Sequence, residues 1–341
     1  MGSAIAVPAA DNAHDVTLVG THLDGDIIAA LKADRGRHPR LGAPLPPGIE
    51  PLDIGELHAG HFETADLIIL GVSSAGMPWA VEHLLRYMGA PKPIALVTKG
   101  LVGGGTERPR TYVESLPEAL RRGGLSASPI IGIGGPCIAR ELAERRPTAV
   151  VYASDGDEPL RRIARWMRTS TYRVSTSADH IGVEACAALK NFYAIGVSAM
   201  WALHANPHCP ERPYAINPAA AVFTQAVKEM GRLVEWMGGQ KETAVDLAGL
   251  GDLHVTVNGG RNSRLGLSLG QGMSVSEALS GPLNGETVEG VDTGRCLSRA
   301  FQAALGDGVF DASAFPLTQS LIGALVENAP FAFDFACLGH A

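Results

Sequence analysis

The chain has 341 residues, of which 46% are hydrophobic and 18% are charged. This length suits two domains, and this composition permits sizeable hydrophobic cores and argues against a disordered chain. The formal net charge of −7 at pH 7 argues against a general attraction to nucleic acid or to an anionic membrane. Five cysteines without a CxxC pair favour reduced thiols in a cytoplasmic protein over a disulfide framework or a structural zinc site.

Short apolar strands alternate with helices in the first half of the chain. After an opening helix that begins at Gly2, strands are expected at 16–19, 66–72, 94–97, 129–134 and 148–153, and helices near 25–33, 76–88, 110–122, 137–145 and 157–168. This alternation predicts a Rossmann-type, doubly wound and mostly parallel sheet over residues 1–179. Ligands of such sheets bind beyond the carboxyl ends of the strands, where Ser73, Lys99 and Gly135 lie.

Helices dominate the second half of the chain. They are expected at 182–203, 218–237, 241–247, 263–270, 274–280, 292–304 and 316–327. No strand periodicity persists there, so an all-helical domain is expected over residues 180–341. A proline-rich loop at 204–217 and two glycine-rich turns, at 249–253 and 258–263, are expected between these helices.

Lys190 is the most unusual residue of the helix expected at 182–203. Nearly every other position of this segment is apolar or small, which is typical of a buried helix. A buried ammonium group is costly unless it meets a carboxylate, a phosphate or a polar substrate, and such an amine can become a proton donor or acceptor. Two other interpretations stay open. Lys190 could extend from the helix to water, or the segment could span a membrane, against which the polar residues Glu184, Lys190 and Asn191 argue.

The turn at 258–263 is a candidate anion site. Its two glycines precede Arg261 and Asn262 at the start of an expected helix, where backbone N–H groups and the helix dipole favour phosphate. An ordinary turn with Ser263 as the N-cap is the alternative. The residues expected to line one cleft between the two domains are Lys190, Lys99, Asp252, Arg261 and Asn262. Two amines, a carboxylate and a phosphate clamp suit reduction of a small phosphorylated ketone, with hydride from a nicotinamide.

Two groups of histidines give only weak signs of a metal site. His58 and His61 have HxxH spacing, and His204, His208 and Cys209 lie close together in the proline-rich loop. Neither group has an evident full set of ligands, so no metal is expected.

Six sets of residues carry a resemblance to a known family. They are, in chain order, 97–101 (VTKGL), 135–141 (GPCIARE) with 147–150 (PTAV), 182–184 (GVE) with 188–191 (ALKN), 249–253 (GLGDL), 259–262 (GGRN) and 288–291 (VEGV). The chain thus resembles the NAD(P)-dependent glycerol-3-phosphate dehydrogenase family over most of its length. Residues 2–6 and 15–18 resemble the first helix and the second strand of that family.

The resemblance implies reversible hydride transfer between dihydroxyacetone phosphate and sn-glycerol 3-phosphate, with NAD or NADP as the cofactor. It implies Lys190 as the proton donor and acceptor, with Lys99 and Asp252 as further catalytic residues. The implied substrate-binding residues are Lys99, Gly135, Cys137, Lys190, Asn191, Asp252, Thr256, Arg261 and Asn262. The implied cofactor-binding residues are Gly2, Ser3, Ser73, Lys99, Ala139, Arg261, Thr287 and Glu289. A cytoplasmic homodimer that serves glycerol-3-phosphate metabolism and phospholipid biosynthesis is also expected.

Three departures from the family pattern bear on these expectations. The chain begins at what corresponds to the last glycine of the family's GxGxxG turn, so the first strand is expected to be missing and the natural start to lie upstream. Cys137 stands where the family more often has serine, and Gly260 stands where bacterial members often have serine.

Two alternative functions stay open. One is a related reductase of another small 2-hydroxy acid or polyol phosphate. The other is a non-catalytic sugar-phosphate-binding protein that has lost its cofactor, which the missing first strand would explain. The preference for NAD or NADP also stays open, because Thr21 and His22 follow the second strand where an acidic residue would favour NAD and a basic one NADP.

Overall fold

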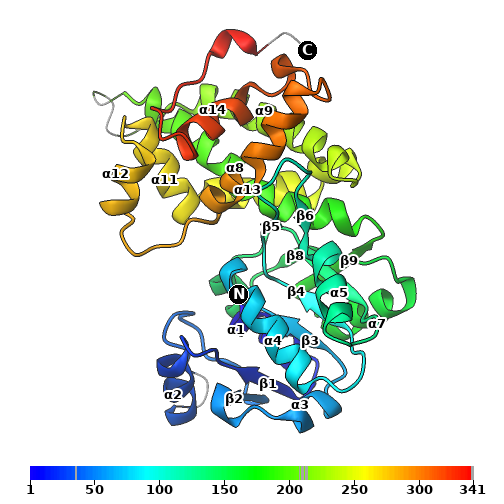
Figure 1. Cartoon of the computed structure of the whole chain (residues 1–341). Helices are drawn as coiled ribbons and strands as arrows, with labels where there is room; N and C mark the ends of the chain where they lie inside the picture. The colour runs from blue at the N-terminus through cyan, green and yellow to red at the C-terminus, as the bar shows by residue number, and fades with distance from the viewer. Residues whose placement is uncertain (35–36, 207, 209–210, 212–213, 339–341) are drawn as a thin grey trace. The chain divides into compact units, whose positions relative to one another are not determined.

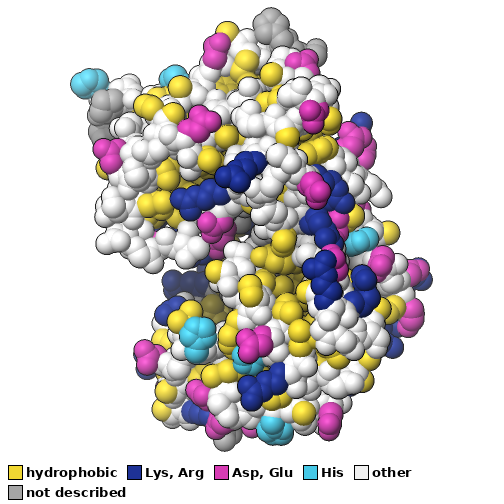
Figure 2. Space-filling view, in the orientation of Figure 1, with side chains coloured by type: hydrophobic (Ala, Val, Ile, Leu, Met, Phe, Trp, Pro, Cys, Tyr) yellow, Lys and Arg dark blue, Asp and Glu magenta, His cyan; other side chains and the backbone are white. Residues whose placement is uncertain are grey.

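The structure is a computed structural model that describes residues 1–34, 37–206, 208, 211 and 214–338. It consists of two compact units. The N-terminal unit comprises residues 1–99 and 113–180, and the helical unit comprises residues 100–112 and 181–341. Relative to the expected boundary near residue 179, the segment 100–112 groups with the helical unit. Figure 2 shows acidic and basic side chains interspersed among apolar ones on the visible face of both units.

A five-stranded sheet forms the centre of the N-terminal unit (Figure 1). Its strand order is β3-β4-β7-β8-β9, and all neighbours are parallel except β7 and β8. The strands are β3 (Ile68–Leu70), β4 (Ile94–Leu96), β7 (Ile130–Gly134), β8 (Thr148–Ala153) and β9 (Tyr172–Ser177). The helices between or before them are α4 (Met77–Tyr87), α5 (Tyr112–Arg122), α6 (Ala139–Ala143) and α7 (Asp157–Met167). The predicted α/β architecture with a mostly parallel sheet is therefore confirmed.

A second, smaller sheet lies in the same unit. It pairs β1 (Val16–Val19) with β2 (Ile49–Leu52) in parallel. The helices near it in sequence are α1 (Gly2–Asp11), α2 (Gly25–Ala33) and α3 (Ala59–Thr64). Within the described residues no ladder joins β1 to β3. This interruption is the one expected of a doubly wound sheet that lacks its first strand.

The strands β2 and β9 are not predicted from the sequence. Pro51 lies in β2, and a proline argues against a strand unless the strand is an edge, which β2 is. In β9, buried Tyr172 and Val174 alternate with exposed Arg173, unlike the continuous apolar runs of the inner strands. Both strands therefore lack the pattern by which the inner strands were recognised.

Helix α1 packs into the hydrophobic core of the N-terminal unit. Its residues Ala4, Ile5 and Val7 are at most 3% exposed and belong to the cluster that fills this core. Gly71, directly after β3, lies against the start of the helix, since a Cβ on Gly71 would be only 2.6 Å from Cα of Gly2. The N-terminus of α1 is thereby fixed at the carboxyl end of β3.

Helix α8 (His180–Leu203) is the long buried helix that the sequence predicts. It is the one helix of the described chain long and apolar enough to cross a membrane, but 89% of its apolar window is buried inside the protein. It is therefore a core helix of the helical unit. The later elements of this unit are α9 (Ile216–Trp236), η3 (Lys241–Val245), η4 (Leu247–Gly251), α10 (Asp252–Val257), α11 (Arg261–Gly270), α12 (Val275–Ser280), α13 (Glu289–Gly306), η5 (Ala312–Ala314), α14 (Pro316–Leu325) and η6 (Phe335–Cys337).

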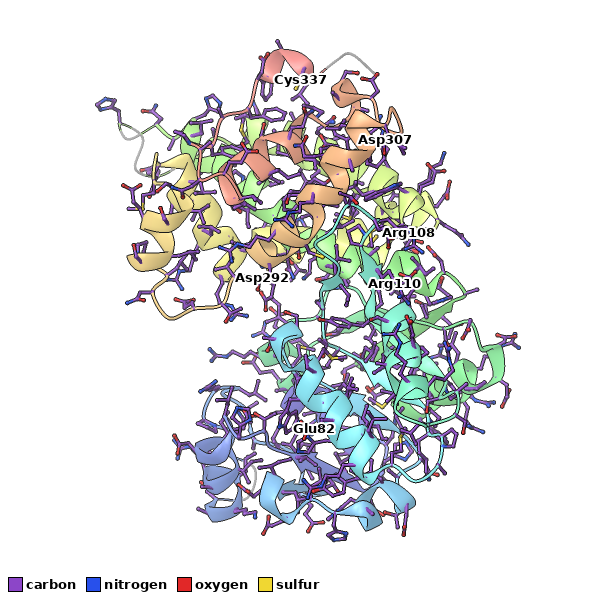
Figure 3. All side chains as sticks on the ribbon, in the orientation of Figure 1. Glu82, Arg108, Arg110, Asp292, Asp307 and Cys337 are labelled. Carbon is purple, nitrogen blue, oxygen red and sulfur yellow. The ribbon has the colours of Figure 1, made fainter. Side chains whose placement is uncertain are left out.

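The helical unit also contains a short antiparallel hairpin of β5 (Leu101–Val102) and β6 (Arg110–Thr111). The strand β5 contacts α13. Figure 3 labels Arg108 and Arg110 on the hairpin and Asp292 on α13. This contact explains why residues 100–112 group with the helices rather than with the sheet that precedes them.

The prediction of a glycine-rich turn at 249–253 is wrong. Residues 247–251 form a π-helical turn, η4, that runs directly into α10. Gly249 is needed here for close packing, because a Cβ at this position would lie 2.2 Å from the carbonyl oxygen of Ala244. Gly249 thus permits contact with η3, and the chain continues from η4 into α10 without a break.

A buried carboxylate joins three helices in the core of the helical unit. Glu229 of α9 is 0% exposed, and its oxygens accept hydrogen bonds from the backbone N–H groups of Leu317 (2.9 Å) and Thr318 (2.7 Å) in the first turn of α14. The Thr318 hydroxyl also donates to Glu229, and it lies 2.8 Å from the hydroxyl of Tyr193 on α8. Burial raises the pKa of Glu229, although these donors oppose the shift. The carboxylate satisfies N–H groups that have no partner within α14.

Three glycines let neighbouring helices approach the backbone of α8. A Cβ on Gly266 or Gly270 of α11 would lie 2.3 Å and 2.1 Å from the carbonyl oxygens of Ile195 and Ala199. A Cβ on Gly290 of α13 would lie 2.5 Å from the carbonyl oxygen of Asn191. The three carbonyls are spaced by four residues, so α11 and α13 hold one face of α8.

Replacing Gly266 by alanine should therefore destabilise the helical unit. The added methyl group has no space against α8, and overpacking of this kind costs about 1–3 kcal/mol. The control is Gly306→Ala, at the exposed end of α13, where a Cβ would meet no atom within 4 Å. Its free energy of unfolding should change by less than ~1 kcal/mol. Denaturant unfolding of both variants measures the difference, and equal stability would show that α8 and α11 are not closely packed.

Candidate functional site

A buried ion pair lies at the centre of the polar residues of the helical unit. The Nζ of Lys190 donates to Oδ1 of Asp252 at 2.7 Å, and the two residues are 6% and 2% exposed. Lys190 Nζ also donates to Oγ1 of Thr256 at 2.7 Å, and this hydroxyl donates to the carbonyl oxygen of Asp252. Asp252 and Thr256 are four residues apart in α10 and so face Lys190 together.

This geometry decides between the interpretations of Lys190 that the sequence left open. The amine does not extend to water but meets a carboxylate, as predicted for a lysine in a buried apolar helix. An ammonium removed from water is retained only when its charge and its hydrogens are satisfied. A fixed ammonium of this kind can give a proton to a substrate oxygen or take one back.

The start of α11 lies close to the same stretch of α8. Nδ2 of Asn262 donates to Oδ1 of Asn191 at 3.1 Å, and Oδ1 of Asn262 accepts from the backbone N–H of Gly290 at 2.9 Å. Arg261, the first residue of α11, pairs with Glu289 at 2.7 Å, and both side chains remain partly exposed. A guanidinium group at the N-terminus of a ten-residue helix suits a phosphate group.

Two serines that the sequence analysis did not assign to the site support this helix start. Ser263 is not the N-cap of α11 but lies inside it, with its hydroxyl donating to the carbonyl oxygen of Val257 at 2.9 Å. The hydroxyl of Ser198 on α8 donates to Ser263 at 3.1 Å. Both serines are buried. Only the contact between distant helices gives them this role, so no local sequence signal could have indicated it.

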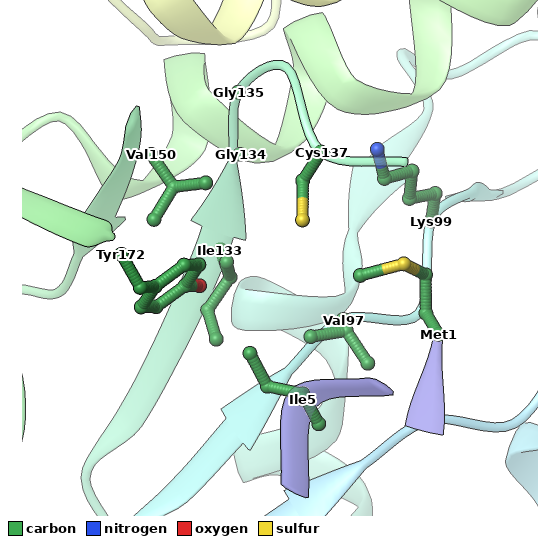
Figure 4. A pocket seen from close by; sticks show the side chains of 10 residues that line it. All are labelled: Met1, Ile5, Val97, Lys99, Ile133, Gly134, Gly135, Cys137, Val150 and Tyr172. Carbon is green, nitrogen blue, oxygen red and sulfur yellow. The ribbon is translucent and has the colours of Figure 1, made fainter. Parts of the chain in front are cut away.

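In the N-terminal unit, predicted residues meet at the carboxyl ends of β4 and β7 (Figure 4). A small pocket of about 20 Å³ lies there, with room for about one water molecule. It is lined by Met1, Ile5, Val97, Lys99, Ile133, Gly134, Gly135, Cys137, Val150 and Tyr172. Gly135 has a φ of +115°, and a Cβ there would lie 3.1 Å from Cα of Val150, so this position requires glycine. Lys99, Gly135 and Cys137 thus line one pocket, and their contacts to a substrate stay a prediction.

The other predicted cofactor residues lie at helix starts. Gly2 and Ser3 begin α1, and the Ser3 hydroxyl lies 3.1 Å from Nε2 of His38. Ser73 precedes η2 (Ser74–Gly76), and Ala139 begins α6. The contact of Gly2 with Gly71 leaves the N-terminus of α1 beside the end of β3, which fits the pyrophosphate of a dinucleotide. Thr287 is exposed in the helical unit, two residues before Glu289. That Lys99 and Lys190 share one cleft stays a prediction.

The weak metal candidates gain no support. His58 caps α3 and pairs with His61 in a capping box, which accounts for both rings. Among the described residues no group of three or more His, Cys, Asp or Glu side chains could hold a metal ion. Cys209, part of the other candidate group, lies outside the described residues.

Comparison with known proteins gives matches over both halves of the chain. The family model described as NAD-dependent glycerol-3-phosphate dehydrogenase N-terminus matches residues 1–159, and the corresponding C-terminus model matches residues 179–332. The NADP(+)-dependent glycerol-3-phosphate dehydrogenase of Archaeoglobus fulgidus is 35% identical over 82% of this chain and 80% of its own length. A glycerol-3-phosphate dehydrogenase (NAD(P)+) of Desulfitobacterium hafniense is 31% identical over 96% of this chain and 85% of its own length.

A solved structure is similar over nearly the whole chain. The glycerol-3-phosphate dehydrogenase of Coxiella burnetii superposes with a TM-score of 0.75 at 28% identity, over 97% of this chain and 94% of that chain. The family and the fold therefore agree with the resemblance seen in the sequence.

The ion pair can be tested through stability. Asp252→Ala leaves the ammonium of Lys190 buried without its carboxylate, which should cost about 3–5 kcal/mol. Adding Lys190→Met removes the stranded charge, so the double variant should be more stable than Asp252→Ala alone. Denaturant unfolding of the two proteins gives the comparison. A double variant that is less stable than the single one would show that Lys190 does not depend on Asp252.

Proposed function

We propose the roles of individual residues from one premise, which is that the chain belongs to the NAD-dependent glycerol-3-phosphate dehydrogenase family. It is an NAD(P)-dependent oxidoreductase that interconverts dihydroxyacetone phosphate and sn-glycerol 3-phosphate. Of the alternatives, neither another reductase nor a binding protein without cofactor is favoured by any observation of the described residues. The observation that most directly supports the proposal is the buried ion pair of Lys190 and Asp252, in the same unit as Arg261 at the start of α11.

Lys190 is the proton donor and acceptor in this proposal. When the ketone is reduced, its carbonyl oxygen gains negative charge, and the ammonium of Lys190 stabilises that charge and gives up a proton. In the reverse direction the neutral amine takes the proton from the hydroxyl group. Asp252 and Thr256 hold Nζ at a fixed position throughout, because each is 2.7 Å away.

Arg261 binds the phosphate group of the substrate. Its guanidinium lies at the start of α11, where backbone N–H groups also favour an anion. Glu289 orients the guanidinium through the 2.7 Å pair and leaves the rest of it exposed. Lys99, Gly135 and Cys137 of the N-terminal unit are proposed to complete the contacts to the substrate. A thiol is a weaker hydrogen-bond donor than a hydroxyl, so the contribution of Cys137 is small.

The cofactor supplies the hydride when it is bound. The proposed contacts to it come from the residues named by the resemblance, which are Gly2, Ser3, Ser73, Lys99, Ala139, Arg261, Thr287 and Glu289. The relative from A. fulgidus is named NADP(+)-dependent and the one from D. hafniense NAD(P)+, which supports testing both nucleotides. A homodimer in the cytoplasm that feeds phospholipid biosynthesis is proposed on the same resemblance.

The proposal predicts that Lys190→Ala loses most of its turnover. The wild-type protein should oxidise NADH or NADPH when dihydroxyacetone phosphate is added, and the variant should be slower by about 10²–10⁴-fold, because it lacks the positioned acid. The control is Lys228→Ala, which removes an exposed lysine of α9 and should leave the rate unchanged. A Lys190→Ala variant that keeps more than about a tenth of the rate would remove Lys190 from this role.

A further inference from the structure

Two ion pairs tie helix α11 to the chain around the start of α13. The first joins Nη2 of Arg261 to Oε1 of Glu289 at 2.7 Å. The second joins Nη1 of Arg264 to both carboxylate oxygens of Glu286, at 2.7 and 3.0 Å. The two arginines are three residues apart on one face of α11, and the two glutamates are also three residues apart. The two pairs are therefore neighbours, but the proposed reaction uses only the first of them.

The second pair holds a loop that has few other contacts. This loop joins α12 to α13 and spans residues 281–288 (Figure 1). Leu283 and Val288 are buried and anchor it near its two ends, whereas residues 284–287 between them are exposed or half-buried. In the described part of the chain, the hydrogen bonds that reach residues 284–287, apart from backbone bonds, come from Arg264. The conformation of this short segment therefore depends on Arg264.

Arg264 is placed to hold the loop in one conformation. Its Nη2 donates to the carbonyl oxygen of Pro282 at 2.7 Å, so a single guanidinium bridges the beginning of the loop and Glu286. Two engaged nitrogens fix the orientation of the planar group, which a lysine could not reproduce. The helix that carries Arg264 is itself fixed, because Gly266 and Gly270 lie against the backbone of α8. The loop is thus attached to a rigid part of the helical unit.

The loop carries a residue that is proposed to contact the cofactor. Thr287 is exposed and directly follows Glu286, and Glu289 comes two residues later. The backbone of Thr287 is therefore held from both sides, by the pair with Arg264 before it and by the pair with Arg261 after it. Exposed ion pairs add little to folding stability, so a pair that orders a binding loop shows its effect in ligand affinity instead.

We propose that Arg264 and Glu286 are positioning residues for the nicotinamide nucleotide, which hold the loop so that Thr287 and Glu289 are in place before the nucleotide binds. The inference rests on the proposed function, in which Thr287 and Glu289 contact the cofactor. It adds two residues that neither the resemblance nor the proposed reaction assigns. When Arg261 turns from Glu289 to the phosphate of the substrate, the second pair keeps the loop attached to α11.

The test is the dissociation constant of the reduced nucleotide for Glu286→Gln, measured by fluorescence titration without substrate. Glutamine keeps the size of the side chain but weakens the pair with Arg264, so the loop spends less time in the binding conformation. The dissociation constant should rise about three- to tenfold for NADH or NADPH, whichever the wild type binds more tightly. If Arg264 instead contacted the nucleotide itself, loss of the opposing carboxylate would strengthen its attraction for phosphate, and binding would become tighter.

A charge reversal separates the pair from its individual members. Arg264→Glu places two carboxylates against each other and should weaken nucleotide binding at least as much as Glu286→Gln. Adding Glu286→Arg restores an ion pair and should recover most of the lost affinity. The matched control is Glu242→Gln, which neutralises an exposed glutamate of η3 and should leave the dissociation constant unchanged.

Two further measurements distinguish positioning from a loss of folding. For Glu286→Gln the midpoint of unfolding should stay close to the wild-type value, because the pair is exposed. The kcat at saturating nucleotide should stay within about twofold of the wild-type value, since neither residue touches the reacting atoms. A general loss of structure would lower the midpoint and kcat together.

Unchanged or tighter nucleotide binding by Glu286→Gln, with a wild type that binds, would overturn the inference. A charge reversal that recovers no affinity would overturn it as well, because the effect would then not arise from the pair. A wild-type protein that binds neither NADH nor NADPH would refute the proposed function, and the role of Arg264 with it.

Discussion

The ion pair between Lys190 and Asp252 is the constraint on which the helical unit depends. An ammonium group in the middle of an apolar helix is stable only if a carboxylate lies at hydrogen-bond distance, and Asp252 lies 2.7 Å away. Thr256 supplies a second acceptor from the same face of α10. The helix α10 must therefore dock on α8 in one register, because a shift would leave a buried charge without its partner.

Close packing around α8 makes that register possible. Gly266, Gly270 and Gly290 bring α11 and α13 against its backbone, and Glu229 links α9 and α14 to it through Thr318 and Tyr193. The polar groups of the helical unit that the proposed reaction uses thus lie on closely packed helices. A fixed arrangement of donors is what proton transfer and anion binding require, since reorganisation of flexible groups would add to the barrier.

The sequence predicts the site better than it predicts the contacts that hold the site. The apolar run of α8 indicates the burial of Lys190, and the glycines before Arg261 indicate the start of α11. The partner of Lys190 is 62 residues away in sequence, so the sequence predicts Asp252 in the same cleft as Lys190 but has no local signal for the ion pair itself. The hydrogen bonds of Ser198 and Ser263, and the one between Asn262 and Asn191, arise from packing of distant helices and have no local signal.

The same limit applies to the fold. The inner strands are continuous apolar runs and were found, whereas β2 contains Pro51 and β9 alternates, so neither matches the pattern of a buried parallel strand. The glycines at 249 and 251 predict a turn between helices. In the structure Gly249 instead lets η4 pack closely against Ala244 of η3. A glycine needed for contact and one needed for a turn look alike until the neighbour is known.

The most direct test of the account is to follow the transferred hydrogen. Reduced nicotinamide nucleotide that carries deuterium at its transferable position is mixed with dihydroxyacetone phosphate and either the wild-type protein or Lys190→Met. The product of each reaction is examined by mass spectrometry. The account predicts deuterium on the carbinol carbon of sn-glycerol 3-phosphate with the wild-type protein, and incorporation slower by about 10²–10⁴-fold with the variant. Equal incorporation by both proteins, or none by the wild type, would contradict it.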